Sequence, residues 1–194
     1  TNLINIIQRV KPDEIYNLGA QSHVAVSFDT PEYTANCDAL GTLRILEAVR
    51  TLKRIDHTKI YQASTSELYG LVQASPQNEN TPFHPASPYA ISKCSADLIG
   101  RFYAEAHNMR VLTTRMFTHT GPRRGDVFME STFAKQIAMI EAGMLPPVIK
   151  VGNLRSLRTW SDVRDAVRAY HLLVTHNPIA GEYYNIGGTY TCSI

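Results

Sequence analysis

"KIYQASTSELYG", residues 59–70, changes character halfway along. Its first part, "KIYQA", carries the β-branched and aromatic residues typical of a strand. The chain then continues through Ser64, Thr65 and Ser66 directly before Glu67. Hydroxyl side chains can cap a turn by bonding their own backbone. A polar loop at a strand end is also where α/β sheets bind ligands. A self-capping turn and a catalytic loop are therefore both open interpretations.

Patterns of strand and helix alternate on both sides of this stretch. Prolines 31 and 88 stand at helix starts, and Gly143 stands at a helix end. The expected helices are residues 3–10, 31–53, 88–108, 128–143 and 162–176. The expected strands or extended pieces are residues 13–20, 59–63, 110–117, 146–152 and 181–188. Such alternation predicts an α/β fold, a doubly wound and mostly parallel Rossmann-like sheet with right-handed crossovers.

Three polar loops each follow an expected strand: "LGAQSHV" at 18–24, "STSELYG" at 64–70 and "THTGPRRG" at 118–125. Ligands of open parallel sheets bind beyond the carboxyl ends of the strands. These three loops are therefore the candidate ligand-binding segments. The apolar residues of 128–143 have helical spacing and are predicted to be core or interface packing.

The glycine-rich turn that usually opens a nucleotide-binding domain is missing from the sequence. No G-x-x-G-x-x-G pattern occurs, and the chain opens on an expected helix and stops at a strand end. We therefore expect a Rossmann-like domain truncated at the N-terminus, whose first βαβ unit lies upstream, with part of a small substrate-binding domain.

The composition is that of an ordinary globular domain. Of 194 residues, 44% are hydrophobic and 19% charged, with a formal net charge of +2. This balance gives no reason to expect nucleic acid or a membrane as partner. No long apolar run or signal peptide is present. Cysteines 37, 94 and 192 match no zinc or redox spacing, which favours reduced thiols and a cytoplasmic location. The seven histidines form no ligand pair, so no metal site is predicted.

Tyr89 and Lys93 in "SPYAISK" lie four residues apart, one turn along the same helical face. A free tyrosine, with a pKa of about 10, is a poor base at neutral pH. A nearby ammonium favours the phenolate, which can then take a proton from a sugar hydroxyl. The plain alternative is an amphipathic helix with the tyrosine in the core and the lysine in water.

The hydroxyl-rich loop strengthens the catalytic interpretation. Thr65 precedes Tyr89 by 24 residues and follows a strand, so loop and helix can meet at one sheet edge. Thr65 could then bond the reacting hydroxyl, and Glu67 could act as acid or base on a neighbouring carbon. The alternative remains a capped turn with a nearby carboxylate.

Four stretches resemble a known family: "YNLGAQSHV" at 16–24, "QASTSELYG" at 62–70, "SPYAISK" at 87–93 and "NCDALGT" at 36–42. They are similar to the extended short-chain dehydrogenase/reductase superfamily, and within it to the GDP-mannose 4,6-dehydratases. Asp38 follows the dehydratase pattern where many relatives carry Asn. The likeness covers nearly the whole chain.

The resemblance implies a role for each matching position. The implied catalytic residues are Thr65, Glu67, Tyr89 and Lys93. The implied NADP contacts are Leu18, Gly19, Ala20, Gln21, Ser22, Tyr33, Lys93, His119 and Arg124. The implied substrate contacts are Ser66, Thr118 and Arg158, while Arg155 is left open. Residues 1–120 would be the C-terminal part of the NADP-binding domain, and 121–194 a partial substrate-binding region interleaved with the last strands.

The implied reaction is the conversion of GDP-mannose to GDP-4-keto-6-deoxymannose by an NADP-dependent hydro-lyase. Tyr89 would take the C4 hydroxyl proton as hydride leaves C4, and Glu67 would take the C5 proton as water leaves C6. The hydride would return to C6. The resemblance also implies a homodimer or homotetramer.

The likeness is uneven. Three stretches are more similar to 4-keto-6-deoxymannose reductases: "RMFTHTGPRRGDVF" at 115–128, "FAKQIAMIEAG" at 133–143 and "VGNLRSLRTWSDVRDAVRAY" at 151–170. Thr118 stands where the dehydratases typically carry an Asn. A reductase or epimerase of the same superfamily is therefore an alternative, as is an inactive fragment. Glu67 favours dehydration, because reduction needs no C5 base.

Overall fold

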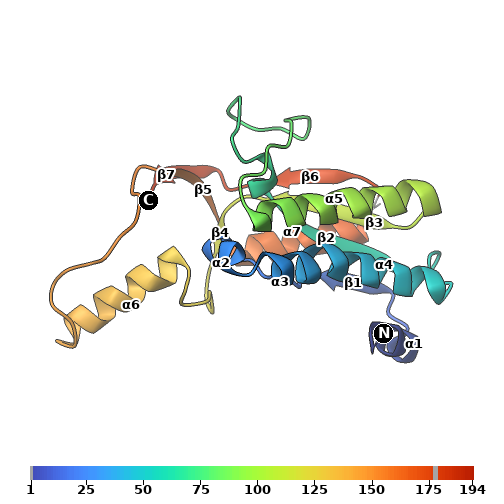
Figure 1. The fold of residues 1–194 in the computed structure, drawn as a ribbon, viewed down its shortest axis with the longest axis horizontal. Helices are drawn as coiled ribbons and strands as arrows, with labels where there is room; N and C mark the ends of the chain where they lie inside the picture. The colour runs from blue at the N-terminus through green and yellow to red at the C-terminus, as the bar shows by residue number, and fades with distance from the viewer. Residues whose placement is uncertain (1, 177–178) are drawn as a thin grey trace. The chain divides into compact units, whose positions relative to one another are not determined.

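The computed structural model describes residues 2–176 and 179–194, which form two compact units. Unit 1 comprises the chain up to Met116 together with Arg168–Ile186. Unit 2 comprises Phe117–Val167 and Gly187–Ile194. Figure 1 shows their elements, and each unit is described by itself.

Unit 1 is built on a four-stranded parallel sheet of order β1-β2-β3-β6. Its strands are β1 (Glu14–Asn17), β2 (Lys59–Thr65), β3 (Val111–Met116) and β6 (Tyr183–Ile186). All six residues of β3 are buried, as expected of a central parallel strand covered on both faces. The predicted mostly parallel sheet is confirmed.

Helices cover both faces of this sheet (Figure 1). One face carries α3 (Pro31–Ala35), a π-helix (Asn36–Leu40), α4 (Gly41–Thr51) and α5 (Pro88–His107). On the other face the ring of Tyr61 stacks on Tyr170 of α7 (Val163–Thr175), with centroids 4.4 Å apart. Consecutive residues of β2 thus serve different layers, because side chains alternate across a strand.

A cluster of apolar side chains fixes the helices to the sheet. It joins Leu46 and Val49 of α4 to Ile60 and Val111 of the sheet, and Ile7 of α1 (Asn2–Val10) to the same core. Each such burial stabilises the fold by about 1.5–3 kcal/mol.

Helix α5 begins and ends where the sequence predicts. The Ser87 hydroxyl accepts a hydrogen bond from the Ala90 N–H at 3.0 Å, and Pro88 occupies the first turn. The helix ends at Asn108, which adopts the left-handed conformation with φ 51°. At Gly100, α5 packs on β3, where an added Cβ would be in van der Waals contact with the Val111 side chain at 3.4 Å.

Two features of unit 1 were not predicted. The expected continuous helix 31–53 contains the π-helix Asn36–Leu40. The polar loop after β1 continues into a short helix, α2 (Val24–Asp29), which His23 caps by accepting from the Val26 N–H.

Unit 2 contains a three-stranded sheet of order β4-β5-β7, formed by β4 (His119–Thr120), β5 (Leu157–Asp162) and β7 (Tyr190–Ser193). Arg158, an implied substrate contact, lies on β5. The expected extended piece 146–152 is not a strand. Two prolines begin it, and the Lys150 backbone bonds the Gln136 side chain instead.

Helix α6 (Met129–Glu141) also departs from expectation. It ends close to Gly143, which has φ +70° as predicted for a helix stop. None of its residues, all of which the structure describes, is buried. The interpretation as core packing is thus wrong for this chain, while interface packing stays a prediction.

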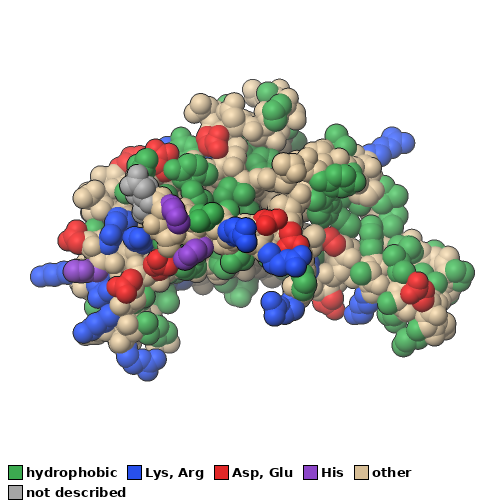
Figure 2. Space-filling view, turned by 180° about the vertical axis from the view of Figure 1, so that it is seen from behind, with side chains coloured by type: hydrophobic (Ala, Val, Ile, Leu, Met, Phe, Trp, Pro, Cys, Tyr) green, Lys and Arg blue, Asp and Glu red, His purple; other side chains and the backbone are tan. Residues whose placement is uncertain are grey.

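On the face drawn in Figure 2, basic and acidic side chains are interspersed with hydrophobic ones. This mixture fits the near balance of 19 basic and 17 acidic residues. No helix in the described part of the chain has both the length and the apolar character to cross a membrane.

Candidate active site

The polar exit of β2 is a capped turn. Thr65 is extended, and its hydroxyl accepts a hydrogen bond from the Glu67 N–H at 3.2 Å, which starts the 3-10 helix Ser66–Tyr69. Glu67 is exposed and Ser66 is half-buried. The Ser64 hydroxyl is buried and has no hydrogen-bond partner within residues 2–176 and 179–194. The self-capping interpretation is confirmed, and it leaves a carboxylate accessible beside buried hydroxyls.

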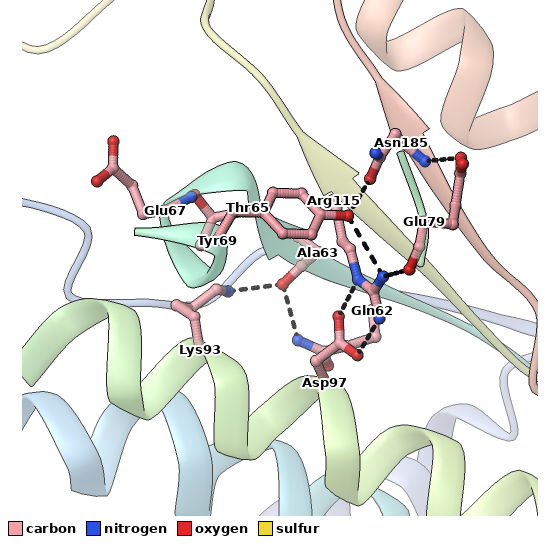
Figure 3. A network of polar contacts seen from close by, with 10 residues as sticks. All are labelled: Gln62, Ala63, Thr65, Glu67, Tyr69, Glu79, Lys93, Asp97, Arg115 and Asn185. Carbon is pink, nitrogen blue, oxygen red and sulfur yellow. Dashed lines mark hydrogen bonds and ion pairs between the residues drawn. The ribbon is translucent and has the colours of Figure 1, made fainter. Parts of the chain in front are cut away.

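Helix α5 brings Lys93 to this strand end. The Lys93 ammonium donates to the Ala63 carbonyl at 2.6 Å, and the Gln62 amide donates to the same oxygen at 2.9 Å (Figure 3). Tyr89 lies in the first turn of α5 and is 8% exposed. The expected meeting of loop and helix at one sheet edge is thus present for Lys93, which is buried rather than in water.

Burial governs the charge of Lys93. Desolvation lowers its pKa, while the carboxylates of Asp38 and Asp97 oppose that shift. Groups whose pKa is shifted by burial and by nearby charges cluster at functional sites, which makes Lys93 a candidate site residue.

Asp38 faces this region from the π-helix. Its Oδ1 accepts a hydrogen bond from the Gln21 backbone N–H at 2.8 Å. Its Oδ2 is buried without a hydrogen-bond partner among the residues described. Burial raises the pKa of Asp38, while the Gln21 bond and the charge of Lys93 lower it. Single π-turns inside helices are frequent at functional sites.

The loop after β1 is fixed by side chains and leaves its backbone accessible. Asn17 donates to Gln62 at 2.7 Å and accepts from the Gly19 N–H at 3.3 Å. The Gln21 amide donates to the Thr34 hydroxyl at 3.1 Å. The predicted cofactor contacts Leu18, Gly19, Ala20 and Ser22 are exposed.

Tyr33 of α3 presents its side chain outward, 61% exposed. Its hydroxyl shares a hydrogen bond with Cys37, which raises the pKa of the tyrosine.

Four predicted residues belong to unit 2. The Thr118 carbonyl accepts from the Ser161 N–H at 3.2 Å, and the His119 ring contacts the Phe117 carbonyl at 3.0 Å. Arg124 lies 3.6 Å from the Glu130 carboxylate and over the Phe128 ring. Arg158 is exposed and donates only to the neighbouring Leu157 carbonyl among the contacts described; Arg155 is also exposed.

Three residues that shape this edge were not predicted as site residues. Gln62, Asp97 and Arg115 are all buried beside the predicted ones. Asp97 carried a usable signal, because it lies one turn beyond Lys93 on the helix face that meets the sheet.

The whole chain, residues 1–194, matches the family model described as GDP-mannose 4,6 dehydratase. It is 51% identical over 174 residues to GDP-mannose 4,6-dehydratase of Vibrio cholerae, covering 90% of this chain and 46% of that protein. It is 48% identical over 177 residues to the human GDP-mannose 4,6 dehydratase, covering 91% and 47%. The chain thus spans about half the length of these curated relatives.

Solved structures share the fold. RMD from Pseudomonas aeruginosa, complexed with NADPH, superposes with a TM-score of 0.86 at 32% identity, over 94% of this chain and 60% of that one. DesIV, a dTDP-glucose 4,6-dehydratase from Streptomyces venezuelae with NAD bound, has a TM-score of 0.85 at 26% identity, over 98% and 57%. The parallel sheet, the motifs at its carboxyl edge and the match over every residue agree, and the chain belongs to the GDP-mannose 4,6 dehydratase family.

Proposed function

We propose that the protein carrying this chain is an NADP-dependent GDP-mannose 4,6-dehydratase. The observation that carries the proposal is Lys93, a buried ammonium bonded to the Ala63 carbonyl at the strand end that bears Thr65 and Glu67. Membership of the family supports the choice of GDP-mannose.

The residues at the end of β1 fit a dinucleotide. Asn17 and Asp38 hold the loop through the N–H groups of Gly19 and Gln21, which leaves accessible backbone for a ligand. The buried ammonium of Lys93 has donors beyond its bond to Ala63. The proposed NADP contacts are Leu18, Gly19, Ala20, Gln21, Ser22, Tyr33, Lys93, His119 and Arg124. When bound, NADP supplies the hydride acceptor and donor for the sugar carbons.

Tyr89 and Lys93 are proposed to handle the first proton. Tyr89 takes the proton of the C4 hydroxyl, and the positive charge of Lys93 on the same helical face favours the phenolate. Thr65, whose oxygen is already used as acceptor by the Glu67 N–H, keeps its own hydrogen to donate to the sugar oxygen.

Glu67 is proposed to handle the second proton. Its exposed carboxylate follows the cap of Thr65 by two residues and points away from the buried network in Figure 3. Once C4 is a ketone, the C5 proton is acidic enough for a carboxylate base, and loss of water from C6 follows.

Ser66, Thr118 and Arg158 are proposed substrate contacts. The exposed guanidinium of Arg158 has N–H donors beyond its bond to the Leu157 carbonyl, and these could bind a diphosphate. Residues 1–120 are proposed to serve the cofactor and 121–194 the nucleotide sugar. A homodimer or homotetramer is proposed by family likeness. A cytoplasmic location is proposed from the three free cysteines.

A reductase acting on a 4-keto sugar is the second candidate. The stretch "FTHTGPRRG", which resembles the 4-keto-6-deoxymannose reductases, favours it. Incubation of the complete gene product with GDP-mannose and NADP separates the two. A dehydratase yields a product lighter by one water without net NADPH change. Stoichiometric NADPH consumption with a 4-keto sugar, and no loss of water from GDP-mannose, would contradict the proposal.

A further inference from the structure

A buried ion pair lies beside the candidate site in unit 1. The Arg115 guanidinium bonds both carboxylate oxygens of Asp97, at 3.1 Å and 3.2 Å. Figure 3 shows the two side chains facing each other. They are 1% and 0% exposed. Removing two charges from water is costly, and apolar side chains of similar size often stabilise a fold at least as well. Stability alone therefore does not explain the pair.

The remaining donors of Arg115 reach two other segments. One guanidinium nitrogen donates to the Glu79 carbonyl at 2.9 Å and to the Tyr69 hydroxyl at 3.3 Å. The rings of Phe83 and Tyr183 flank the guanidinium, with centroids at 4.6 Å and 4.1 Å. The cation thus joins the 3-10 helix Ser66–Tyr69 and the loop 71–87 to strand β3.

A second layer of bonds closes the network. The Tyr69 hydroxyl donates to the Asn185 side chain at 2.6 Å. The Asn185 N–H in turn donates to the Glu79 carboxylate at 2.7 Å. Both Tyr69 and Glu79 are therefore held from two sides, by Arg115 and by β6.

The anchored turn is the one that carries the proposed C5 base. Tyr69 lies two residues after Glu67 in the same 3-10 helix. Gly70 follows with φ +54°, at a point where a Cβ would overlap the His84 backbone, so the turn and the loop are closely fitted. On the other side, Asp97 lies one turn beyond Lys93 on α5. The ion pair stands where the Glu67 turn and the Lys93 helix meet.

We propose that Arg115, held by Asp97, is a positioning residue that fixes the turn bearing Thr65 and Glu67 against the helix bearing Tyr89 and Lys93. This inference rests on the proposed function for its catalytic consequence. Proton transfer at C5 depends on the position of the carboxylate, and a displacement of about 1 Å can cost on the order of 100-fold in rate.

A single and a double variant together distinguish a role of Arg115 in stability from a role in positioning. In the complete gene product, Arg115→Met alone leaves Asp97 buried and unpaired, whereas Arg115→Met with Asp97→Leu removes both charges. We expect the double variant to regain most of the lost thermal stability. We also expect it to keep its KM within about twofold and to lose roughly tenfold or more in kcat. A stable double variant with full kcat would overturn the proposal.

If the double variant does not fold, two single tyrosine variants test the positioning role with a smaller structural change. Tyr69→Phe removes one buried hydroxyl of the network, and Tyr61→Phe removes a buried hydroxyl that bonds Thr114 on the other face of the sheet. We expect Tyr69→Phe alone to lower kcat about tenfold, because the turn that carries Glu67 loses two buried hydrogen bonds, to Asn185 and from Arg115. We also expect faster amide hydrogen exchange over residues 66–84 in that variant.

The hydrogen-exchange result does not depend on the reaction. If the wild-type protein fails to dehydrate GDP-mannose, the proposed function is wrong. Faster amide exchange in Tyr69→Phe would still support the anchoring of the turn by Arg115. If the wild-type protein is active and the two tyrosine variants behave alike in both kcat and exchange, the positioning role is wrong.

Discussion

The cations of unit 1 and unit 2 differ in what holds them. Lys93 and Arg115 are buried, and each donates to partners in other elements. Arg124 is 32% exposed and 3.6 Å from its carboxylate, and Arg158 bonds only the carbonyl of the preceding residue among the contacts described. In unit 1, the bonds of Lys93 and Arg115 to other elements fix where the two charges lie. In unit 2, the exposed guanidinium of Arg158 stays accessible, as recognition of a phosphate requires.

Because of this contrast, we propose different roles for the cations of the two units. A proton-transfer site needs fixed geometry and shifted pKa values, which burial supplies. A site for the nucleotide part of a substrate needs accessible cations. Substitutions that remove one charged side chain at a time test this difference between the units.

Lys93→Met is expected to have the largest effect on activity. Loss of the ammonium should lower kcat/KM about 1,000-fold, within the usual contribution of acid–base catalysis. Thermal stability should not fall, because burial already disfavours the charge and lowers the pKa of Lys93. The matched control is Lys59→Met, since Lys59 also donates to a carbonyl, that of Val174, at the opposite end of β2. Equal losses in both variants would contradict a catalytic Lys93.

Glu67→Gln is expected to separate the two proton transfers. C4 oxidation should persist, whereas release of water should slow about 100-fold for want of the C5 base. Single-turnover mass analysis should show the unreacted or oxidised hexose instead of the dehydrated product. Glu105→Gln, an exposed carboxylate on α5, is the control. Full dehydration by Glu67→Gln would remove Glu67 from the mechanism.

Arg158→Met is expected to act on binding alone. The KM for GDP-mannose should rise about tenfold, with kcat within twofold, because a charge-assisted contact to phosphate is worth on the order of 1.5–3 kcal/mol. Arg164→Met makes a matched comparison. The Arg164 guanidinium is already engaged by Asp162 at 2.6 Å and 2.9 Å, so its loss should leave KM unchanged. A fall in kcat with unchanged KM for Arg158→Met would contradict the proposed role of Arg158 in substrate binding.

The smallest expected effect is on acid stability. Hydrogen bonds from Arg50 and Tyr103 lower the pKa of Glu47 to about 2. Because this is below the unfolded value of about 4.3, the contribution to stability is present above that value and is lost as pH falls toward 2. Glu47 is 38% exposed, so Glu47→Gln should change the free energy of unfolding by less than about 1 kcal/mol. Urea unfolding at pH 7 and pH 3 should show a smaller acid loss in the variant than in the wild type.

Much of unit 1 could be predicted because local signals and burial agree. Ser87, Pro88 and Asn108 mark the ends of α5, and the apolar pattern of 59–63 marks β2. Helix α2 was missed because "VAVSFD" is poor in strong helix formers and is capped by a histidine side chain. The π-helix has no propensity signal, so the burial of Asp38 could not be foreseen.

The types of residue in the candidate site could be predicted from the sequence. The contacts that hold those residues in place could not. The spacing of Tyr89 and Lys93 indicates a shared helix face, whereas the Ala63 acceptor depends on how α5 lies on the sheet. The Arg115 network joins residues as far apart as Glu79 and Asn185, which no local pattern connects. In unit 2, β5 was missed because its sequence "LRTWSD" has no apolar–polar alternation and none of its residues is fully buried.

The most direct measurement of the central claim follows the hydrogen at C4. The complete gene product is incubated with GDP-mannose deuterated at C4 and with unlabelled NADP. We expect the deuterium to appear at C6 of the dehydrated product, because the hydride removed from C4 returns to the same sugar. Product without deuterium at C6, or recovery of the label in free reduced cofactor, would contradict it.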